Sequence, residues 1–480
     1  MQKTYSGHFS FERVEIISSD GTAVEISNQV VQITIFEDTF NAAIHGEITF
    51  NDNFNLQNTL PLIGQEMLSL KIKTPIIQDE EYDIDFTEHM FALFELTQTV
   101  IVNDYNQLHT MKFISIEHIR NQRTKISRTL EGTYSDIVTQ IMKKDLESTK
   151  NLWIEPSSGI KRLNALNQHP IDIIRQLRTQ AVTTYNNSPT YIFYETMWGY
   201  HFRSLESLYA EYPVANYTSL PPGQDTIKDR QNIPVEFTKI KDFSISSRPN
   251  TLTNQKDGTY GSTLIVHDIF NKKFSTHTYN YFDVFDKEKH INSYQGKHQA
   301  PIFSKVGNAV GKRVSDHPSK LYLSPTSING EGKDAHAVDV NNQANYTPYK
   351  PEQWLQRRNS QISQLDGGII LTIIVDGNTL VHAGDIVDVQ VPYNASNKHS
   401  KTENVDKFFR GPFFVKAVRH DFNVPTAKHE MILTLVKDCV DEELPYMESW
   451  NESASTVVGQ TYTNFYVNYE TLNFVPDDLR

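Results

Sequence analysis

The stretch Gln29-Val-Val-Gln-Ile-Thr-Ile35 alternates between apolar and polar side chains, and it places Val31, Ile33 and Ile35 on one face. A period of two is typical of a half-buried β-strand. The hairpin signal Asp20-Gly21 precedes this stretch. Further runs with the same period cover residues 44–50, 68–72, 94–96 and 111–113. Several short strands separated by turns predict an antiparallel sandwich or barrel near the N-terminus.

Three of these N-terminal segments have counterparts of the same phase after Gly368. The phase has to agree, because a one-residue slip would exchange the core and solvent faces of a strand. The matching pairs are residues 67–72 with 386–391 at an offset of 319, and 92–95 with 412–415 and 109–113 with 429–433 at an offset of 320. Either alternating strands resemble one another by chance, or the chain holds two copies of one β-barrel. Two copies per chain would give a trimer six similar barrels around an axis.

The middle of the chain mixes helical and extended patterns. Residues 133–148 carry apolar side chains at helical spacing, and His169-Pro170 begins a second helical run, where proline suits the first position. Extended patterns cover residues 191–194, 200–203 and 232–295, whereas the polar residues 296–350 predict long loops. A third helix is expected from Pro351, and Gly367-Gly368 ends it before the apolar strand 369–375.

We therefore expect a mainly β protein with inserted α+β structure: two similar tube-type antiparallel β-barrels and a mixed domain. The predicted divisions are an N-terminal barrel at 1–120, a mixed α+β domain at 121–230, a discontinuous second barrel at 231–260 and 365–440, an insertion of strand, loop and helix at 261–364 that belongs with the mixed domain, and an acidic, aromatic C-terminal arm at 441–480. A frayed tail is the alternative reading of the last forty residues.

Composition excludes several classes of protein. The chain of 480 residues has 45 basic and 58 acidic side chains, so its formal net charge is −13. This charge excludes a protein whose whole surface is basic and binds nucleic acid through its phosphates. A channel that lets nucleic acid pass remains possible. The single cysteine, Cys439, allows neither an intramolecular disulfide nor a thiolate metal cluster, and it fits a reducing compartment. The N-terminus lacks the pattern of a signal peptide, and no apolar run is long enough to span a bilayer, so we expect a soluble protein made in a cytoplasm.

No catalytic motif is found, and we predict no catalytic, cofactor-binding or metal-binding residue, no cofactor and no enzymatic activity. The segment from Gly307 to Arg313 differs from a phosphate loop in its spacing and in having Arg313 where a hydroxyl is needed. His267, His277 and His290 lack tight ligand spacing, so ordinary hydrogen bonds explain them better than zinc. The acidic runs 79–81 and 441–443 are read as solvated loops, with a cation site or pore lining as the alternative.

Aromatic residues gather in two places. Tyr279, Tyr281, Phe282 and Phe285 form either core or subunit interface, or a platform that stacks on sugars. Aromatic side chains in residues 441–480 suggest an arm that wraps a partner; they include Trp450, Tyr462, Phe465, Tyr466, Tyr469 and Phe474.

Nine motifs in a fixed order resemble the baseplate hub proteins of T-even-like contractile-tailed phages, cyanophage hubs in particular. They are Phe36-Glu-Asp-Thr-Phe40, His45-Gly-Glu-Ile-Thr-Phe50, Asn55-Leu56, Leu60-Pro-Leu-Ile-Gly64-Gln-Glu66, Tyr191-Ile-Phe-Tyr-Glu195, Gly199-Tyr-His-Phe-Arg-Ser-Leu205, Trp354-Leu-Gln-Arg-Arg-Asn-Ser-Gln361, Leu365-Asp-Gly-Gly368 and Ala383-Gly-Asp-Ile-Val387. The matches spread over about residues 30–440, and their order rather than any single motif carries the resemblance.

The resemblance implies a homotrimeric ring in the baseplate of a virion tail, assembled in the host cytoplasm. Two tube-type barrels per chain would turn a threefold spike into a pseudo-sixfold platform that joins the tail tube to the central spike. Expected partners are two further copies, the spike protein, tail tube or tube-initiator proteins and possibly the tape measure protein. DNA would pass through the bore without sequence-specific binding, and edge strands should pair or abut across subunits.

Three alternatives remain open at this point. The spike of a contractile secretion system shares the hub fold, but such a chain should continue into a small barrel and a repetitive β-helix, and this one ends at Arg480. A wall-degrading tail hydrolase would need a nucleophile motif or metal cluster. A glycan-binding tail protein would use exposed Tyr and Phe side chains.

Overall fold

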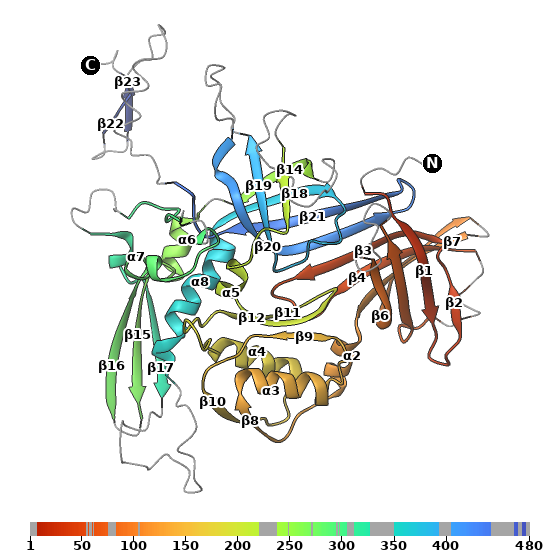
Figure 1. The fold of residues 1–480 in the computed structure, drawn as a ribbon, viewed down its shortest axis with the longest axis horizontal. Helices are drawn as coiled ribbons and strands as arrows, with labels where there is room; N and C mark the ends of the chain where they lie inside the picture. The colour runs from red at the N-terminus through yellow and green to blue at the C-terminus, as the bar shows by residue number, and fades with distance from the viewer. Residues whose placement is uncertain are drawn as a thin grey trace. The chain divides into compact units, whose positions relative to one another are not determined.

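The computed structural model describes residues 7–53, 56, 60, 62–74, 83–103, 106–219, 238–247, 249–269, 272–293, 296, 298–304, 312–326, 350–392, 405–442, 465–468 and 473–476. The chain divides into two compact units, residues 1–442 and 443–480. The first unit is dominated by one large, mostly antiparallel sheet to which short helices are added (Figure 1). The predicted mainly β fold with inserted helical elements is confirmed.

The first seven strands, called here the N-terminal strand set, surround a common hydrophobic core. Their bounds are β1 Ser10–Ile17, β2 Ala23–Glu25, β3 Val30–Asp38, β4 His45–Asp52, β5 Met67–Lys73, β6 Ile84–Asn103 and β7 Asn106–Ser115. Inward side chains such as Ile33, Ile48 and Leu70 are fully buried, as the alternation of polar and apolar residues predicts.

Six later strands, the C-terminal strand set, continue the same sheet. They are β13 Ala215–Thr218, β14 Ile240–Ser247, β18 Ile369–Asp376, β19 Ile386–Pro392, β20 Val405–Asn423 and β21 Lys428–Lys437. The strand β18 begins directly after Gly368, as predicted, and its inward residues Leu371 and Ile373 are fully buried.

The two strand sets share one order of strands. The order is β3-β4-β7-β6-β5-β1 in the N-terminal set and β14-β18-β21-β20-β19-β13 in the C-terminal set. Cross-strand neighbours correspond residue by residue: the ladder Ile33–Ile48–Met111–Leu96 has its counterpart in Phe243–Ile373–Leu433–Val418. One pair differs, because β1 is antiparallel to β5 whereas β13 is parallel to β19.

Two β-bulges recur at matching positions in the two sets. The register of β6 against β7 shifts after Leu93, and that of β20 against β21 shifts after Val415. The register of β3 against β4 shifts after Val30, and that of β14 against β18 shifts after Ile240. A bulge costs one ladder bond and bends its strand locally. Shared bulges on matching rungs are therefore a more specific signal than strand order alone.

The turns that lead into β5 and β19 also match. A carboxylate accepts a hydrogen bond from the N–H three residues earlier in both turns: Glu66 from Ile63 and Asp385 from His382, each at 2.8 Å. The carbonyl oxygens of the same two acidic residues accept from the N–H groups of Leu93 and Val415, also at 2.8 Å in both cases. The predicted offset of 319 for this segment is confirmed.

The predicted offset of 320 for the next two strands is wrong by two residues. Leu93 pairs with Phe113 as Val415 pairs with Leu435, so the true offset is 322. A two-residue shift keeps every side chain on its own face, so an alternating sequence pattern cannot detect it.

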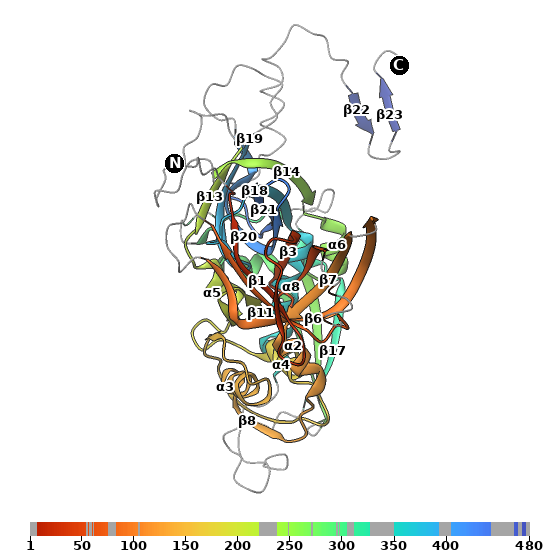
Figure 2. The same ribbon diagram turned by 90° about the vertical axis from the view of Figure 1, so that its right-hand side faces the viewer.

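The central part of the chain packs below this sheet, on the side away from β14 and β19 (Figures 1 and 2). Its elements are α2 Ile116–Arg123, β8 Thr129–Thr133, α3 Tyr134–Gln140 followed by a π-helical turn Ile141–Asp145, β9 Asn151–Ile154, β10 Ile160–Asn164, α4 Pro170–Gln180, β11 Tyr191–Thr196, β12 Gly199–Ser204 and α5 Leu205–Tyr209. A capping box formed by Thr133 and Asp136 starts α3, and Pro170 occupies the first turn of α4, as predicted.

A small three-stranded sheet and the elements around it depart from the predictions at several places, among them a helix over residues 251–256, which lies in a segment predicted as extended. The elements are α6 Thr251–Lys256, β15 Gly261–Asp268, β16 Lys273–Asn280, α7 Tyr281–Val284 with a 3-10 turn Phe285–Lys287, a 3-10 turn Val314–Asp316, β17 Lys320–Thr326, a 3-10 turn Pro351–Gln353 and α8 Leu355–Gly367. The predicted loop region contains β17, which pairs in parallel with β15, and the aromatic run predicted as extended turns helical at Tyr281. Tertiary pairing and packing override local propensity at both places.

The second unit contains one described hairpin, β22 Phe465–Asn468 paired with β23 Asn473–Pro476. The predicted aromatic residues Trp450, Tyr462 and Tyr469 lie outside the described residues. The predicted five-part division of the chain remains a prediction, because the compact units separate only at residue 442.

Candidate assembly site

The junction between the two strand sets is a seven-rung antiparallel ladder. Residues 417–423 of β20 pair with residues 32–38 of β3, so the sheet runs without interruption from one set to the other. The Thr34 hydroxyl donates to Asp421 Oδ1 at 2.8 Å across this ladder. The N–H and hydroxyl of Thr39 both donate to the Lys416 carbonyl, at 3.0 and 3.1 Å. Such a ladder fixes the position of one set against the other.

Glu37 of β3 ties three distant segments together beneath this ladder. Its carboxylate accepts hydrogen bonds from the N–H groups of Met197, at 2.8 Å, and Ala383, at 3.1 Å. It also lies 3.4 Å from Nδ1 of His382. Glu37 is only 1% exposed, so these contacts replace the water that an ionised carboxylate requires. Two motifs of the resemblance, those beginning at Phe36 and Ala383, therefore meet at one carboxylate, together with Met197 in the turn before Gly199.

The electrostatics favour an ionised Glu37 beside a protonated His382. Burial alone would raise the pKa of Glu37, but the charge and hydrogen bond of His382 outweigh it and lower the pKa. Burial would likewise lower the pKa of His382, but Glu37 raises it above its ordinary value. A hydrogen bond with the Thr379 backbone raises the pKa of His382 further.

Two further histidines next to the junction are neutral. His420 Nδ1 and His429 Nε2 lie 3.1 Å apart, and both side chains are completely buried. Burial lowers the pKa of His429 to about 3. Burial and the neighbouring His429 hold the pKa of His420 well below its ordinary range. One ring must donate and the other accept, which two neutral tautomers allow.

A second buried cluster holds the central part of the chain against the N-terminal strand set. Lys150 Nζ lies 2.9 Å from Glu117 Oε2 and 2.6 Å from Glu195 Oε1. The other oxygen of Glu195 accepts the N–H of Ile44 at 2.8 Å, which connects β11 to the residue just before β4. Burial raises the pKa of Glu195, whereas Lys150 keeps the pKa of Glu117 below its ordinary value despite burial. The ammonium group therefore offsets two buried carboxylates.

Aromatic rings fill the space between these clusters. The imidazole of His201 is stacked between Trp153 and Tyr194, with ring centroids 4.7 and 4.8 Å away. Burial lowers the pKa of His201 to about 3, so the stacked ring is neutral. Gly384 has φ +98°, and a Cβ there would lie 2.1 Å from the Tyr194 hydroxyl oxygen. This glycine is required both for its backbone conformation and for the close approach of the tyrosine.

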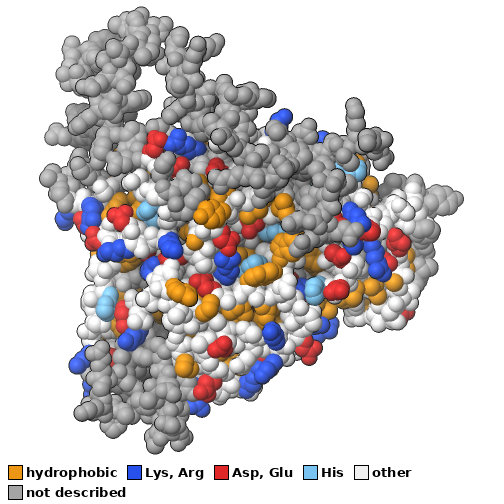
Figure 3. Space-filling model, viewed as in Figure 1, with side chains coloured by type: hydrophobic (Ala, Val, Ile, Leu, Met, Phe, Trp, Pro, Cys, Tyr) orange, Lys and Arg blue, Asp and Glu red, His pale blue; other side chains and the backbone are white. Residues whose placement is uncertain are grey.

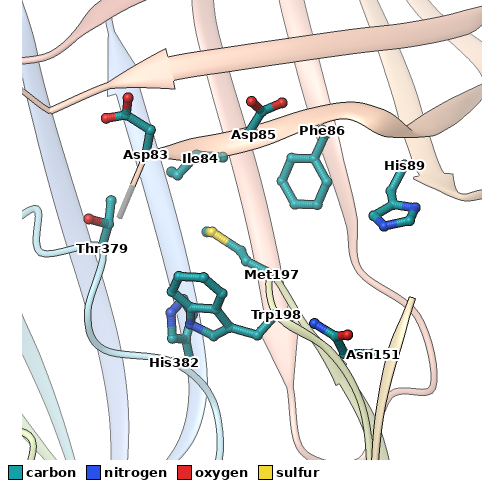
Figure 4. Close-up of a pocket in the computed structure, with 10 residues that line it drawn as sticks. All are labelled: Asp83, Ile84, Asp85, Phe86, His89, Asn151, Met197, Trp198, Thr379 and His382. Carbon is teal, nitrogen blue, oxygen red and sulfur yellow. The ribbon is translucent and has the colours of Figure 1, made fainter. Parts of the chain in front are cut away.

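A pocket of about 210 Å³ opens beside the junction (Figure 4). Asp83 and Asp85 of the β6 region line one side, Trp198 and His382 line the other, and Met197 lies between them. Burial raises the pKa of Asp83 above its ordinary value. The pocket offers carboxylates, an indole and an imidazole, and it can hold a small polar molecule.

The histidines considered for zinc make ordinary contacts. His290 Nδ1 lies 2.8 Å from Asp438 Oδ2 and its Nε2 lies 2.9 Å from the Phe285 carbonyl. His267 stacks on Phe274, and His277 Nε2 lies 3.0 Å from the Ser275 hydroxyl. Across the described ranges, no group of three or more His, Cys, Asp or Glu side chains is placed to hold a metal ion.

The aromatic cluster is core. Tyr279, Tyr281 and Phe285 are 7%, 1% and 5% exposed, and they pack with Tyr260 and the fully buried Cys439. These rings cannot stack on a sugar in solution, so the burial decides between the two readings of the sequence.

The charged segments have mixed outcomes. Asp441 is half-buried and accepts from the buried Lys437 at 2.7 Å, so the prediction of a solvated loop is wrong for this residue. Glu442 is exposed and pairs with Arg410 at the surface, which agrees with that prediction. Arg313 pairs with Asp283 at 2.8 Å. The acidic run 79–81 and residues 307–311 lie outside the described residues.

In the part of the chain that is described, no helix has the length and apolar character needed to cross a membrane.

Glu37 and Glu195 occur in motifs of the resemblance, but their buried contacts were not predicted. The roles of His382 and Lys150 were not predicted either. Glu37 offered one signal: an acidic residue at the end of an alternating apolar strand requires a partner if it is buried. The identity of that partner depends on contacts across more than 300 residues, which no local pattern contains.

The fold and junction define a β-rich protein with two matching strand sets joined through one sheet. No protein-family model matches the chain. The chain is 20% identical over 263 residues to the probable baseplate hub protein gp334 of Vibrio phage KVP40, a match covering 53% of this chain and 59% of that protein. The match thus spans less than two thirds of the relative. It supports the predicted resemblance to phage baseplate hub proteins.

Two solved structures to which the chain is similar, each with a TM-score below 0.5, are tail proteins. A tail protein from Neisseria meningitidis MC58 is 11% identical, with a TM-score of 0.48, and the match covers 89% of this chain and 97% of that one. The 43 kDa tail protein of prophage MuSo2 from Shewanella oneidensis is 9% identical, with a TM-score of 0.48, and the match covers 90% of this chain and 100% of that one.

Proposed function

We propose that this protein is a structural hub of a phage tail baseplate. Three copies form a ring in which each chain contributes two tube-type β-barrels, built from the N-terminal and C-terminal strand sets. The ring presents a pseudo-sixfold surface to the tail tube and a threefold surface to the central spike. The protein acts through its geometry and has no chemistry of its own.

The observation that carries this proposal is the repeated strand order with its shared bulges. Two structurally similar sets in one polypeptide let three chains display six similar units. The buried tie at Glu37 supports the same function, because a platform must hold its two sets in a fixed relation. The sequence similarity to a probable baseplate hub protein agrees with this assignment.

The charge of the chain fits a bore through which DNA passes. The formal net charge is −13, and Figure 3 shows acidic and basic side chains interspersed over the described part of the face it displays. Phosphate groups bind surfaces where lysine and arginine concentrate, and binding then weakens steeply with salt. We propose that acidic residues line the bore and prevent the hub from holding DNA.

The proposed partners are two further copies of the chain, the central spike protein, the tail tube or tube-initiator proteins and the tape measure protein. The proposed location is the tail baseplate of the virion, with assembly in the host cytoplasm. The burial of Tyr281 and Phe285 argues against this one cluster as a platform for sugars.

Native mass measurement together with electron microscopy of the purified protein tests the proposal. We expect a mass of three chains and particles with a central passage. A monomer or dimer at every concentration up to tens of micromolar, or trimers without a passage, would overturn it. Turnover of peptidoglycan by the purified chain would contradict the purely structural role.

A second measurement addresses the bore. Binding of double-stranded DNA to the assembled ring is measured between low and physiological salt. We expect no binding and hence no salt dependence. Binding that weakens steeply as salt rises would show a basic surface and refute the acidic bore.

A further inference from the structure

Two strand edges of the same sheet, on β14 and on the second half of β6, match the junction inside one chain but have no partner strand within the described ranges. One edge of β20 carries β19 along its first half and β3 along residues 417–423. The matching edge of β6 carries β5 only as far as Ala92, and from Leu93 onward β6 pairs with β7 alone among the described strands. Likewise, β14 pairs with β18 alone within the described ranges, whereas its counterpart β3 pairs on both edges.

We propose that a second copy of this chain pairs with these edges. The strand β14 of one copy pairs antiparallel with the second half of β6 of the next copy, and it reproduces between subunits the β20–β3 junction within each chain. This inference rests on the proposed trimeric ring and specifies how that ring is held together.

The internal junction supplies the register. Phe243, Ser244 and Ile245 of β14 correspond to Ile33, Thr34 and Ile35 of β3, because they oppose matching residues of β18 and β4. By the same comparison through β7 and β21, the β6 counterparts of His420, Asp421 and Phe422 are Thr99, Val100 and Ile101. The predicted intersubunit pairs are Thr99 with Ile245, Val100 with Ser244, and Ile101 with Phe243.

The exposure of matched side chains supports this pairing. Ile35 is fully buried at the junction, whereas its counterpart Ile245 is 43% exposed. Phe422 is fully buried, whereas its counterpart Ile101 is 72% exposed, and Val100 beside it is 40% exposed. Exposed apolar side chains on an unpaired strand edge are a template for another strand.

The chemistry of the two edges is complementary. The three pairs place no like charges opposite each other, and Ile101 with Phe243 makes an aromatic pair with a β-branched residue, which stabilises antiparallel sheets. Backbone hydrogen bonds supply the affinity in this mode of recognition, and side chains fix the register. Each copy offers one edge of each kind, so the contact is head-to-tail and generates a ring if the rotation closes.

Cysteine cross-linking tests the register. The internal pair that corresponds to Val100 and Ser244 is Asp421 with Thr34, whose side chains bond directly at 2.8 Å. Directly opposed residues in an antiparallel pair lie about 4.5–5.5 Å apart, within the range that a disulfide spans. The only native cysteine, Cys439, is fully buried and gives little background. The test protein is the full chain with Val100→Cys and Ser244→Cys, oxidised under native conditions.

We expect a ladder of covalent dimer and trimer on non-reducing gels, in yield at least about tenfold above two matched controls, because disulfide geometry is strict. The off-register control combines Val100→Cys with Asp242→Cys, and the collision control combines it with Phe274→Cys on the exposed strand β16. Native mass of each variant is measured before oxidation.

The outcomes separate this inference from the proposed function. Trimeric mass with strong Val100–Ser244 cross-linking supports both. Trimeric mass with cross-linking no greater than in the controls overturns the strand pairing and leaves the ring. Monomeric mass without cross-linking overturns both. The single variants Ile101→Glu and Ile245→Glu place a carboxylate where the internal counterparts, Phe422 and Ile35, are fully buried. Each should shift the native mass toward monomer, and a trimer that tolerates both also contradicts the pairing.

Discussion

Replacing Lys150 with methionine tests how the central part of the chain is held against the N-terminal strand set. The Lys150 side chain is 5% exposed and contacts two carboxylates, those of Glu117 and Glu195, which are 3% and 1% exposed. Methionine fills a similar volume but removes the charge. Both carboxylates would then be buried without a cation, and breaking a buried pair in this way costs about 3–5 kcal/mol.

The loss converts into a modest shift of the melting temperature because the cooperative unit is large. Unfolding entropy near about 2.1 cal/mol/K per residue gives roughly 0.9 kcal/mol/K for the unit of residues 1–442. A loss of about 3–5 kcal/mol should therefore lower the melting temperature by about 3–5 °C if this unit unfolds in one transition. Calorimetry and urea denaturation at pH 7.5 provide the measurement.

The pH dependence separates lost charge from lost packing. Without Lys150, burial raises the folded-state pKa values of Glu117 and Glu195 above their unfolded values. A group with a raised folded-state pKa loses stability as the pH rises, so the deficit of Lys150→Met should shrink as the pH falls from 7.5 toward 5. A packing defect would give the same deficit at every pH.

Two variants control the interpretation. Lys143→Met removes an exposed lysine from the same region and should change stability by less than about 0.5 kcal/mol. Adding Glu117→Gln and Glu195→Gln to Lys150→Met should recover part of the loss. The reasoning fails if Lys150→Met unfolds like the native chain, or if its deficit is the same at pH 7.5 and pH 5.

Three further predictions follow from single features of the structure. Gly384→Ala should lower the free energy of unfolding, measured by urea denaturation, by about 1–3 kcal/mol. The loss should exceed that of the control Gly21→Ala, whose added Cβ meets no atom within 4 Å. Equal losses would refute the argument that the Tyr194 hydroxyl requires a glycine at 384. His420 and His429 are buried with lowered pKa values, so at acidic pH the unfolded chain binds protons that the folded chain does not. The free energy of unfolding should therefore fall by up to about 1.4 kcal/mol per pH unit per histidine as the pH drops below about 6.5. A flat profile from pH 6.5 to 5 would contradict this. Thr133→Ala removes a helix cap and should cost about 1 kcal/mol in the same denaturation assay, whereas Thr133→Ser should cost little; equal effects would exclude the capping hydroxyl as the cause.

Local signals predicted the elements that local chemistry determines. The helix that begins after Thr133 carries its capping box, and α4 begins at the proline that sequence reasoning placed there. The strand after Gly368 starts at the expected residue. For the two helices the decisive interaction lies within four residues along the chain, so the sequence alone contains it.

Features that depend on distant pairing were missed. The strand β17 lies in a polar region that reads as loop, and it forms because β15 offers a partner edge. The two-residue error in the offset between strand sets arises because alternation fixes the face of a strand but leaves even shifts undetermined. Glu37 meets Ala383 across more than 300 residues, so neither motif alone predicts the contact.

The unpaired edges also have a consequence for the isolated chain. Natural proteins protect edge strands with lysine, proline or inward charges. The segment from Leu96 to Ile101 contains no charged residue and no proline, and the stretch from Phe243 to Ser246 contains none either. Such edges persist only if another strand covers them, because otherwise they pair without control. A subunit that cannot close its ring should therefore aggregate through these two strands, and a charge introduced at Ile101 should protect it while preventing assembly.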